Sequence, residues 1–301
     1  MNIKFNKLDS FFLIDGSYYF YKAYYALPTL TNSKGEPTGA IYGVLNMLDN
    51  FLQSYNPKYM LVVFDAPEKN FRHKLFTQYK SNRRSMPYSL QLQIKPLYNI
   101  IKAMGIPILV ASGGVEADDI IGTLATEYIA CQGGRVYIDS NDKDIAQLVT
   151  SNIFIINTSD NTLVGPSEVL QKYGVPPNLI IDLIALMGDY SDNIPGIPGV
   201  GIKTAQRLLT YIGNVKQIFS NLSKVAELSF PGVKNLTFKL EQYKEMVFLY
   251  RILATIKTDL PIKINYDKLI VNQPNMEEFI KLCKHYEFKN WMHKIQKNLC
   301  N

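Results

Sequence analysis

The sequence predicts an α/β fold: a mostly parallel β-sheet flanked by helices, followed by a helical region. Two observations lead to this prediction. In the first part of the 301-residue chain, short β-branched or apolar runs alternate with segments of helical periodicity, the pattern of parallel strands joined by helices. After about residue 165 the strand signals fade. We therefore divide the chain into an α/β domain, residues 1–165, and a helical region, residues 166–301.

The expected elements can be placed along the chain. Strands are expected at Phe11–Ile14, Met60–Phe64, Ile106–Val110, Val136–Ile138 and Ile153–Ile156. Before the fourth strand, the apolar residues Ile120, Ile121, Leu124, Ala125 and Tyr128 follow helical spacing. In the second region, helices are expected at Pro177–Met187, Lys203–Tyr211, Leu236–Ile252 and around Met276–His285.

Composition narrows the class of protein. No apolar run approaches the roughly 18–20 residues that span a bilayer. The run Phe11–Ile14 is too short for a signal peptide, so we expect a cytoplasmic protein without a membrane partner. Cys131, Cys283 and Cys300 are scattered, and no histidine lies near the acidic clusters, which disfavours zinc. Any metal should therefore have oxygen ligands, which indicates magnesium or manganese.

Acidic residues follow the expected strands at the point where each strand ends. They are Asp15 after the first strand, Asp65 after the second, Glu116, Asp118 and Asp119 after the third, and Asp142 and Asp144 after the fourth. An aspartate in such a place commonly caps the next helix, and Asp119 or Asp144 could serve as both cap and ligand. Because ligands bind at the carboxyl ends of parallel strands, acids from four strands favour a shared cation site over four separate caps.

Two further acids, Asp189 and Asp192, lie in the stretch Gly188–Gly196. They share a face if the turn is helical, because they are three residues apart. Nine carboxylates are more than one cation can use. We therefore expect two cations about 3.5–4 Å apart, the usual arrangement for phosphodiester cleavage.

Basic residues are separated from the acids. From Lys69 to Val115 the chain has no Asp or Glu, although its net charge is only +6. Within this stretch Arg72, Phe76, Tyr79 and Arg83 recur at helical spacing. Such a segment can contact phosphates and stack on unpaired bases. The alternative is a solvated basic helix with its aromatic residues in the core. Candidate DNA contacts here are Arg72, Lys74 and Arg84.

A glycine-rich segment directly follows Asp192. The run from Gly196 to Leu209 has the signature of a helix-hairpin-helix. Gly199 and Gly201 allow a tight hairpin, and the helix amides that follow can bind a phosphate. Lys203 and Thr204 add a charge and a hydroxyl group, so the motif would hold the duplex backbone without recognising sequence. A potassium ion bound by the hairpin carbonyls is compatible with this motif. The alternative is a plain Gly-Pro turn before a helix.

These motifs together resemble the 5′→3′ exonuclease domain of bacterial DNA polymerase I, in the flap endonuclease superfamily. The resemblance is seen in the stretches Leu13–Ser17, Ser33–Ala40, Val62–Asp65, Tyr79–Arg83, Val115–Asp119, Asp142–Asp144, Gly188–Gly196 and the hairpin, and near the end in Leu253–Thr258 and Tyr286–Trp291. The resemblance covers roughly residues 11–292 and implies a PIN-like sheet, a helical gateway near residues 70–100, and a helix-hairpin-helix (H3TH) motif that completes the site.

The resemblance also implies roles for single residues. Asp15, Asp65, Glu116, Asp118 and Asp119 match a first metal site, and Asp142, Asp144, Asp189 and Asp192 match a second, some of them through water. Lys80 and Arg83 match a basic pair that steadies the scissile phosphate, and Tyr79 matches a residue that stacks on a base. Lys22 lies where many relatives have arginine. Asp139 adds an acid beside the second site and could alter its metal affinity.

The function implied by the resemblance is two-magnesium hydrolysis of DNA near a 5′ end, with manganese able to substitute. Expected substrates are 5′ flaps, nicked or recessed duplex, and RNA primers on DNA, in primer removal and repair beside a separate DNA polymerase and ligase. We expect a monomer. Exonuclease and flap endonuclease activity stay open as alternatives, as does a DNA-binding protein without catalysis. A free-standing nuclease is favoured over a truncated polymerase because the chain opens with its own methionine and carries no tag.

Overall fold

The protein is described by a computed structural model, which describes residues 10–158, 161–228, 233–263 and 265–299. Its sheet has the order β3-β2-β1-β4-β5-β6. The strands are β1 (Ser10–Asp15), β2 (Tyr59–Phe64), β3 (Ile108–Val110), β4 (Arg135–Asp139), β5 (Ile153–Asn157) and β6 (Thr162–Val164). The pairings from β3 to β5 are parallel, as predicted, and β6, which the sequence analysis missed, pairs antiparallel to β5.

The helices fall into three sets along the chain. The α/β part contains α1 (Gly16–Ala26), α2 (Gly39–Tyr55), α3 (Phe71–Leu75), α4 (Tyr88–Gln91), α5 (Ile94–Ala103), α6 (Ala117–Gln132) and the 3₁₀ helix η1 (Lys143–Leu148). The second set is α7 (Pro166–Tyr173), η2 (Pro177–Leu179), α8 (Ile180–Met187), α9 (Ile202–Tyr211), α10 (Val215–Ser220), α11 (Leu222–Ala226) and α12 (Val233–Ala254). The chain ends with η3 (Tyr266–Leu269), α13 (Met276–His285) and α14 (Lys289–Leu299). Among the described residues, no helix is long and apolar enough to cross a membrane.

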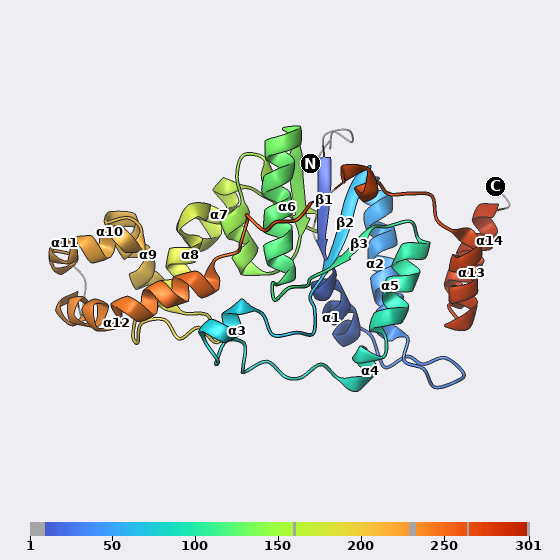
Figure 1. Cartoon of the computed structure of the whole chain (residues 1–301), viewed down its shortest axis with the longest axis horizontal. Helices are drawn as coiled ribbons and strands as arrows, with labels where there is room; N and C mark the ends of the chain where they lie inside the picture. Colours follow the sequence, from blue (N-terminus) through green and yellow to red (C-terminus); the bar gives the residue numbers. More distant parts are fainter. Residues whose placement is uncertain (1–9, 159–160, 229–232, 264, 300–301) are drawn as a thin grey trace.

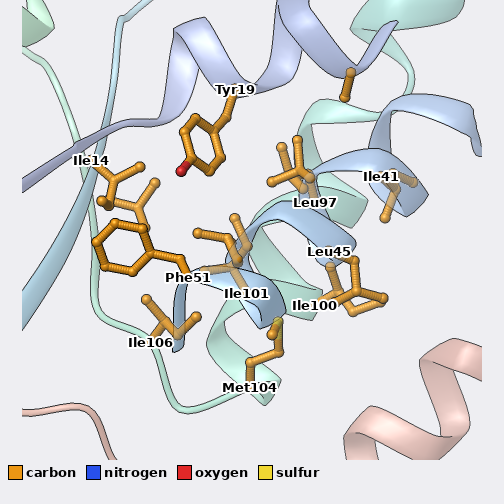
Figure 2. Close-up of a cluster of buried hydrophobic side chains, with 14 of the residues drawn as sticks. Ile14, Tyr19, Ile41, Leu45, Phe51, Leu97, Ile100, Ile101, Met104 and Ile106 are labelled. Atoms are coloured by element: carbon orange, nitrogen blue, oxygen red, sulfur yellow. The ribbon is translucent and has the colours of Figure 1, made fainter. Parts of the chain in front are cut away.

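The sheet is buried on both faces. Phe12 and Ile14 of β1 pack with α1, α2 and α5, whereas Phe11 and Leu13 pack with α6. This division follows from the period of two along a strand. Figure 2 shows the first of these clusters, in which Ile14 and Phe51 lie beside apolar side chains of α5. The two-sided packing fixes the strand ends, and with them the acids that follow.

Helices α7 to α12 have an apolar core of their own, formed by residues such as Leu183, Leu208 and Leu240. Residues 166–228 and 233–254 thus form helices that share one core. At the end of the chain, Phe279, Cys283 and Trp291 of α13 and α14 pack in the core of the α/β part and not with helices α7 to α12. Figure 1 shows α13 and α14 beside α5, at the opposite end of the molecule from α9–α12. The apolar faces of α13 and α14 pack against α2 and α5.

The predicted gateway near residues 70–100 is only partly helical. Helix α3 ends at Leu75, and residues 76–87 form turns before α4 and α5. Lys80 has a φ of 54°, which a right-handed helix does not allow. Its backbone N–H donates to Asp192 O at 3.0 Å instead of to its own segment. The spacing predicted one helix across this stretch. Instead, the residues after Leu75 form turns that contact the loop before the hairpin.

Candidate metal centre and nucleic-acid interface

One hollow lies at the carboxyl ends of β1, β2 and β4, with a volume of about 380 Å³. Five of the nine predicted acids line it: Asp15, Asp65, Glu116, Asp118 and Asp142. We call this site the acid hollow. Asp15 accepts hydrogen bonds from Tyr18 N and from Ser140 Oγ, each at 2.9 Å. Asp65 accepts from Ala117 N at 2.8 Å, so both carboxylates are held by elements that leave the sheet at this edge.

Burial and mutual repulsion make the acid hollow hard to ionise completely. Burial, with the nearby charge of Asp65, raises the pKa of Asp15 to about 7. The pKa of Asp118 lies well above its usual range, because of burial first and then the charges of Asp142, Asp15 and Asp65. Carboxylates crowded in this way need positive charge before they can all be ionised. Their oxygen atoms are the donors that hard divalent cations prefer, so the residues fit such a group.

A second acidic group lies beside the hollow. Asp144, Asp189 and Asp192 are buried, and each offers one oxygen within 4.8 Å of the others. Within the described part of the chain, Asp144 Oδ1 and Asp189 Oδ2 are buried without a hydrogen-bond partner. Asp142 was predicted to belong to this group alone. It lies between the two groups, since its charge raises the pKa of both Asp118 and Asp144.

Asp119 and Arg72 correct the predicted assignment. Asp119 is 0% exposed, and its carboxylate accepts from Arg72 Nη1 at 2.8 Å and Arg72 Nη2 at 2.7 Å. The same carboxylate accepts from the backbone N–H groups of Glu116 and Lys257. Arg72 is 1% exposed and also donates to Leu253 O and Thr255 O. The predictions of Asp119 as a metal ligand and Arg72 as a DNA contact were therefore wrong: the two form a buried ion pair that joins α3, α6 and the end of α12.

The basic pair predicted from the motif reaches the acids. Lys80 Nζ lies 2.7 Å from Glu116 Oε1, and Arg83 Nη2 lies 2.7 Å from Asp192 Oδ1. Tyr79, predicted to stack on a base, is 2% exposed. Its hydroxyl oxygen lies 2.8 Å from Asp192 Oδ2 and 3.1 Å from Glu116 Oε2. The stacking prediction was wrong, because the ring is buried and its hydroxyl group links the two acidic groups.

Two residues predicted near the site lie elsewhere. Lys22 Nζ is 5.2 Å from the centre of the Tyr18 ring, and Lys22 lines a separate hollow with Tyr19. Lys22 therefore does not line the acid hollow, and its role stays a prediction. Asp139 accepts from the Tyr19 hydroxyl at 2.6 Å. Its carboxylate is thus turned toward α1 and away from the second acidic group.

Lys143 is a charged residue of the site that the sequence analysis did not select. It lines the acid hollow, and its Nζ lies 2.6 Å from Asp189 Oδ1. The signal was present in the sequence, because Lys143 stands between two predicted ligands, Asp142 and Asp144.

Of the two glycines predicted to allow the hairpin, Gly199 has a φ of 82°, which favours glycine, whereas Gly201 is extended, with a φ of −90° and open space around an added Cβ atom. At Gly196, with a φ of 66°, an added Cβ atom would lie 2.3 Å from Gly188 N, so only glycine fits this close turn. Helix α9 begins after Gly201, which provides no side-chain cap. Gly199, Gly201 and Lys203 are exposed and Thr204 is half-buried, so the first amides of α9 face an open surface. Lys74 and Arg84 are also exposed.

A mostly parallel sheet with acids gathered at its strand ends, joined to a hairpin with an exposed helix start, is the arrangement expected of a metal-dependent nuclease. Residues 10–174 match the family model for the 5′-3′ exonuclease N-terminal resolvase-like domain, and residues 175–277 match that for the 5′-3′ exonuclease C-terminal SAM fold. The chain belongs to the 5′-3′ exonuclease family.

Relatives of two lengths are similar to the chain. The 5′-3′ exonuclease of Buchnera aphidicola subsp. Schizaphis graminum is 42% identical over 285 residues, which cover 94% of this chain and 99% of that protein. DNA polymerase I of Pseudomonas aeruginosa is 48% identical over 281 residues, but the chain spans only 31% of that protein. The fold is similar to that of the bacteriophage T5 flap endonuclease in a complex with DNA and metal ions, with a TM-score of 0.65, 21% identity, and 92% and 99% of the two chains covered.

Proposed function

We propose that this protein hydrolyses phosphodiester bonds near the 5′ end of duplex or flapped DNA, as a 5′→3′ exonuclease and flap endonuclease. The proposal rests on three features that lie together. They are the acid hollow, the group of Asp144, Asp189 and Asp192, and the hairpin that directly follows Asp192 in the chain. A duplex held by the hairpin would have its backbone beside both acidic groups. Membership of the 5′-3′ exonuclease family supports the same activity.

Two divalent cations complete this proposal, Mg²⁺ by preference with Mn²⁺ as a substitute. We assign Asp15, Asp65, Glu116 and Asp118 to the first and Asp144, Asp189 and Asp192 to the second, with Asp142 between the two. When bound, the pair would lower the pKa of the attacking water and offset the charge that builds on the phosphate. A potassium ion at the hairpin would have to share the carbonyls with Lys239, whose Nζ donates to Pro198 O at 2.8 Å.

The basic residues would bind and orient the substrate. Lys80 and Arg83 line the acid hollow and would pass from Glu116 and Asp192 to the scissile phosphate once cations neutralise these carboxylates. Exposed Lys74 and Arg84 would contact the DNA strand that leaves the site. Gly199, Gly201, Lys203 and Thr204 would bind backbone phosphates of the duplex, which requires no particular base sequence.

The biological setting is part of the proposal. Similarity to DNA polymerase I and to 5′-3′ exonucleases supports primer removal and repair, with a separate polymerase and ligase acting on the same DNA. We propose nicked or recessed duplex, 5′ flaps and RNA primers on DNA as substrates, a monomer as the active form, and the cytoplasm, at the nucleoid, as its location.

A labelled 5′-flap duplex with Mg²⁺ provides the test. We expect the wild-type protein to cut near the junction. The variant Asp118→Asn should bind the same DNA and not cut it. A protein that binds the flap and leaves it intact would be the DNA-binding alternative. Intact acids at both groups disfavour that alternative, because a protein that only binds DNA gains nothing from buried, mutually repelling carboxylates.

A further inference from the structure

Lys143 is a cation placed inside the acidic site. It is the first residue of η1 and lies between Asp142 and Asp144. Its Nζ lies 2.6 Å from Asp189 Oδ1, and the side chains of Lys143 and Asp189 are 33% and 1% exposed. Lys143 therefore lines the acid hollow and binds an acid of the second group.

The two oxygens of Asp189 have different surroundings. Oδ1 accepts from Lys143 and also from Ser191 N at 2.8 Å and Ser191 Oγ at 2.7 Å. Oδ2 is buried and has no hydrogen-bond partner among the described residues. One oxygen is thus fixed by the protein, and the other is free for a cation shared with Asp144 and Asp192.

The charge of Lys143 and its hydrogen bond act in opposite directions on a bound cation. The hydrogen bond helps to orient Asp189, but the two bonds from Ser191 would orient that carboxylate without Lys143. The positive charge repels a divalent cation only a few ångströms away, and this repulsion is strong even near the surface. Repulsion therefore decides the net effect. Arg83 Nη2 and Lys80 Nζ, which lie 2.7 and 3.8 Å from oxygens of Asp192, add two further positive charges to the same group.

We infer that Lys143 is a positioning residue that keeps the second cation weakly bound until DNA arrives. The negative phosphate of the substrate then offsets the repulsion, and the second cation binds with it. The site thus loads fully only on a substrate. This inference rests on the two-cation site of the proposed function.

Equilibrium Mn²⁺ binding without DNA, measured by calorimetry or by the electron paramagnetic resonance of free Mn²⁺, tests the inference. In Lys143→Met the weaker Mn²⁺ should bind at least about tenfold more tightly, because one positive charge has been removed beside it. The stronger Mn²⁺ should bind as in the wild type. The matched control Lys143→Arg keeps the charge and should retain wild-type affinities.

Asp189→Asn assigns the affected site, since the gain from Lys143→Met should disappear in the double variant. An unchanged or lower Mn²⁺ affinity in folded Lys143→Met, with folding checked by thermal unfolding, would overturn the inference. Flap cleavage by the wild-type protein is a separate readout. If the Mn²⁺ affinities follow the charge at position 143 but the protein cuts no flap, the inference about Lys143 stands and the proposed nuclease activity is refuted.

Discussion

The buried pair of Arg72 and Asp119 offers the sharpest test of the structure. Replacing Arg72 with methionine keeps much of the side-chain length but removes the guanidinium group. Asp119, which is 0% exposed, would then lose both hydrogen bonds from Arg72. The carbonyl groups of Leu253 and Thr255 would lose their donor as well.

The expected cost is about 3–5 kcal/mol of unfolding free energy, the usual effect of leaving one member of a buried ion pair without its partner. For a chain of 301 residues that corresponds to a decrease in Tm of roughly 5–8 °C. The assays are thermal unfolding and urea denaturation of the variant and the wild type. Lys74→Met is the matched control, because Lys74 is exposed on the same helix and should change stability by less than about 0.5 kcal/mol.

A DNA-binding role for Arg72 makes the opposite prediction. In that case Arg72→Met would unfold like the wild type and bind flap DNA more weakly. A loss of less than about 1 kcal/mol in the variant would refute the argument from burial.

Three further predictions follow from the site. In EDTA, the free energy of unfolding should fall as pH rises from about 4 toward 7, and saturating Mg²⁺ should remove much of this fall; urea titrations at several pH values measure it. The sign follows from Asp15, whose pKa is raised from 3.8 to about 7 in the folded state, so that the folded protein binds the extra proton in this window. Asp142→Asn should abolish cleavage and raise the Tm of the metal-free protein, because one of the repelling charges is gone; a lower Tm would contradict the proposed crowding. Lys80→Ala should slow the single-turnover cleavage rate by roughly 10²-fold with a smaller change in DNA Kd, as for other charges that stabilise a transition state; an unchanged rate would remove Lys80 from the site.

Much of the α/β architecture could be predicted from local pattern. β1 and β2 were predicted to within a residue at each end, because apolar residues buried on both faces leave a continuous run in the sequence. Helix α13 was predicted with its observed bounds, Met276–His285. The short strand β6 was missed, since three half-buried or exposed residues give no periodic signal.

Some outcomes depended on partners that are distant in the chain. Arg72, Phe76, Tyr79 and Arg83 recur at helical spacing, but the helix ends at Leu75. Beyond it, Lys80 and Arg83 bind Asp192, a partner more than 100 positions away that the local pattern does not reveal. In the same way, α13 and α14 could have continued the helical region by their pattern alone. Their apolar faces meet α2 and α5 because that surface of the α/β part would otherwise be exposed.

The sequence by itself determined that acids gather at one edge of a parallel sheet, because each follows a strand and the strands run the same way. Only the tertiary structure decided which acids face the hollow. Asp118 and Asp119 are neighbours in the first turn of α6, and such neighbours point about 100° apart. Arg72, 47 positions earlier, meets Asp119 and leaves Asp118 to the hollow. No local pattern distinguishes these two adjacent aspartates. Asp119 is a buried counter-ion and Asp118 a candidate ligand only because the fold brings Arg72 to one of them.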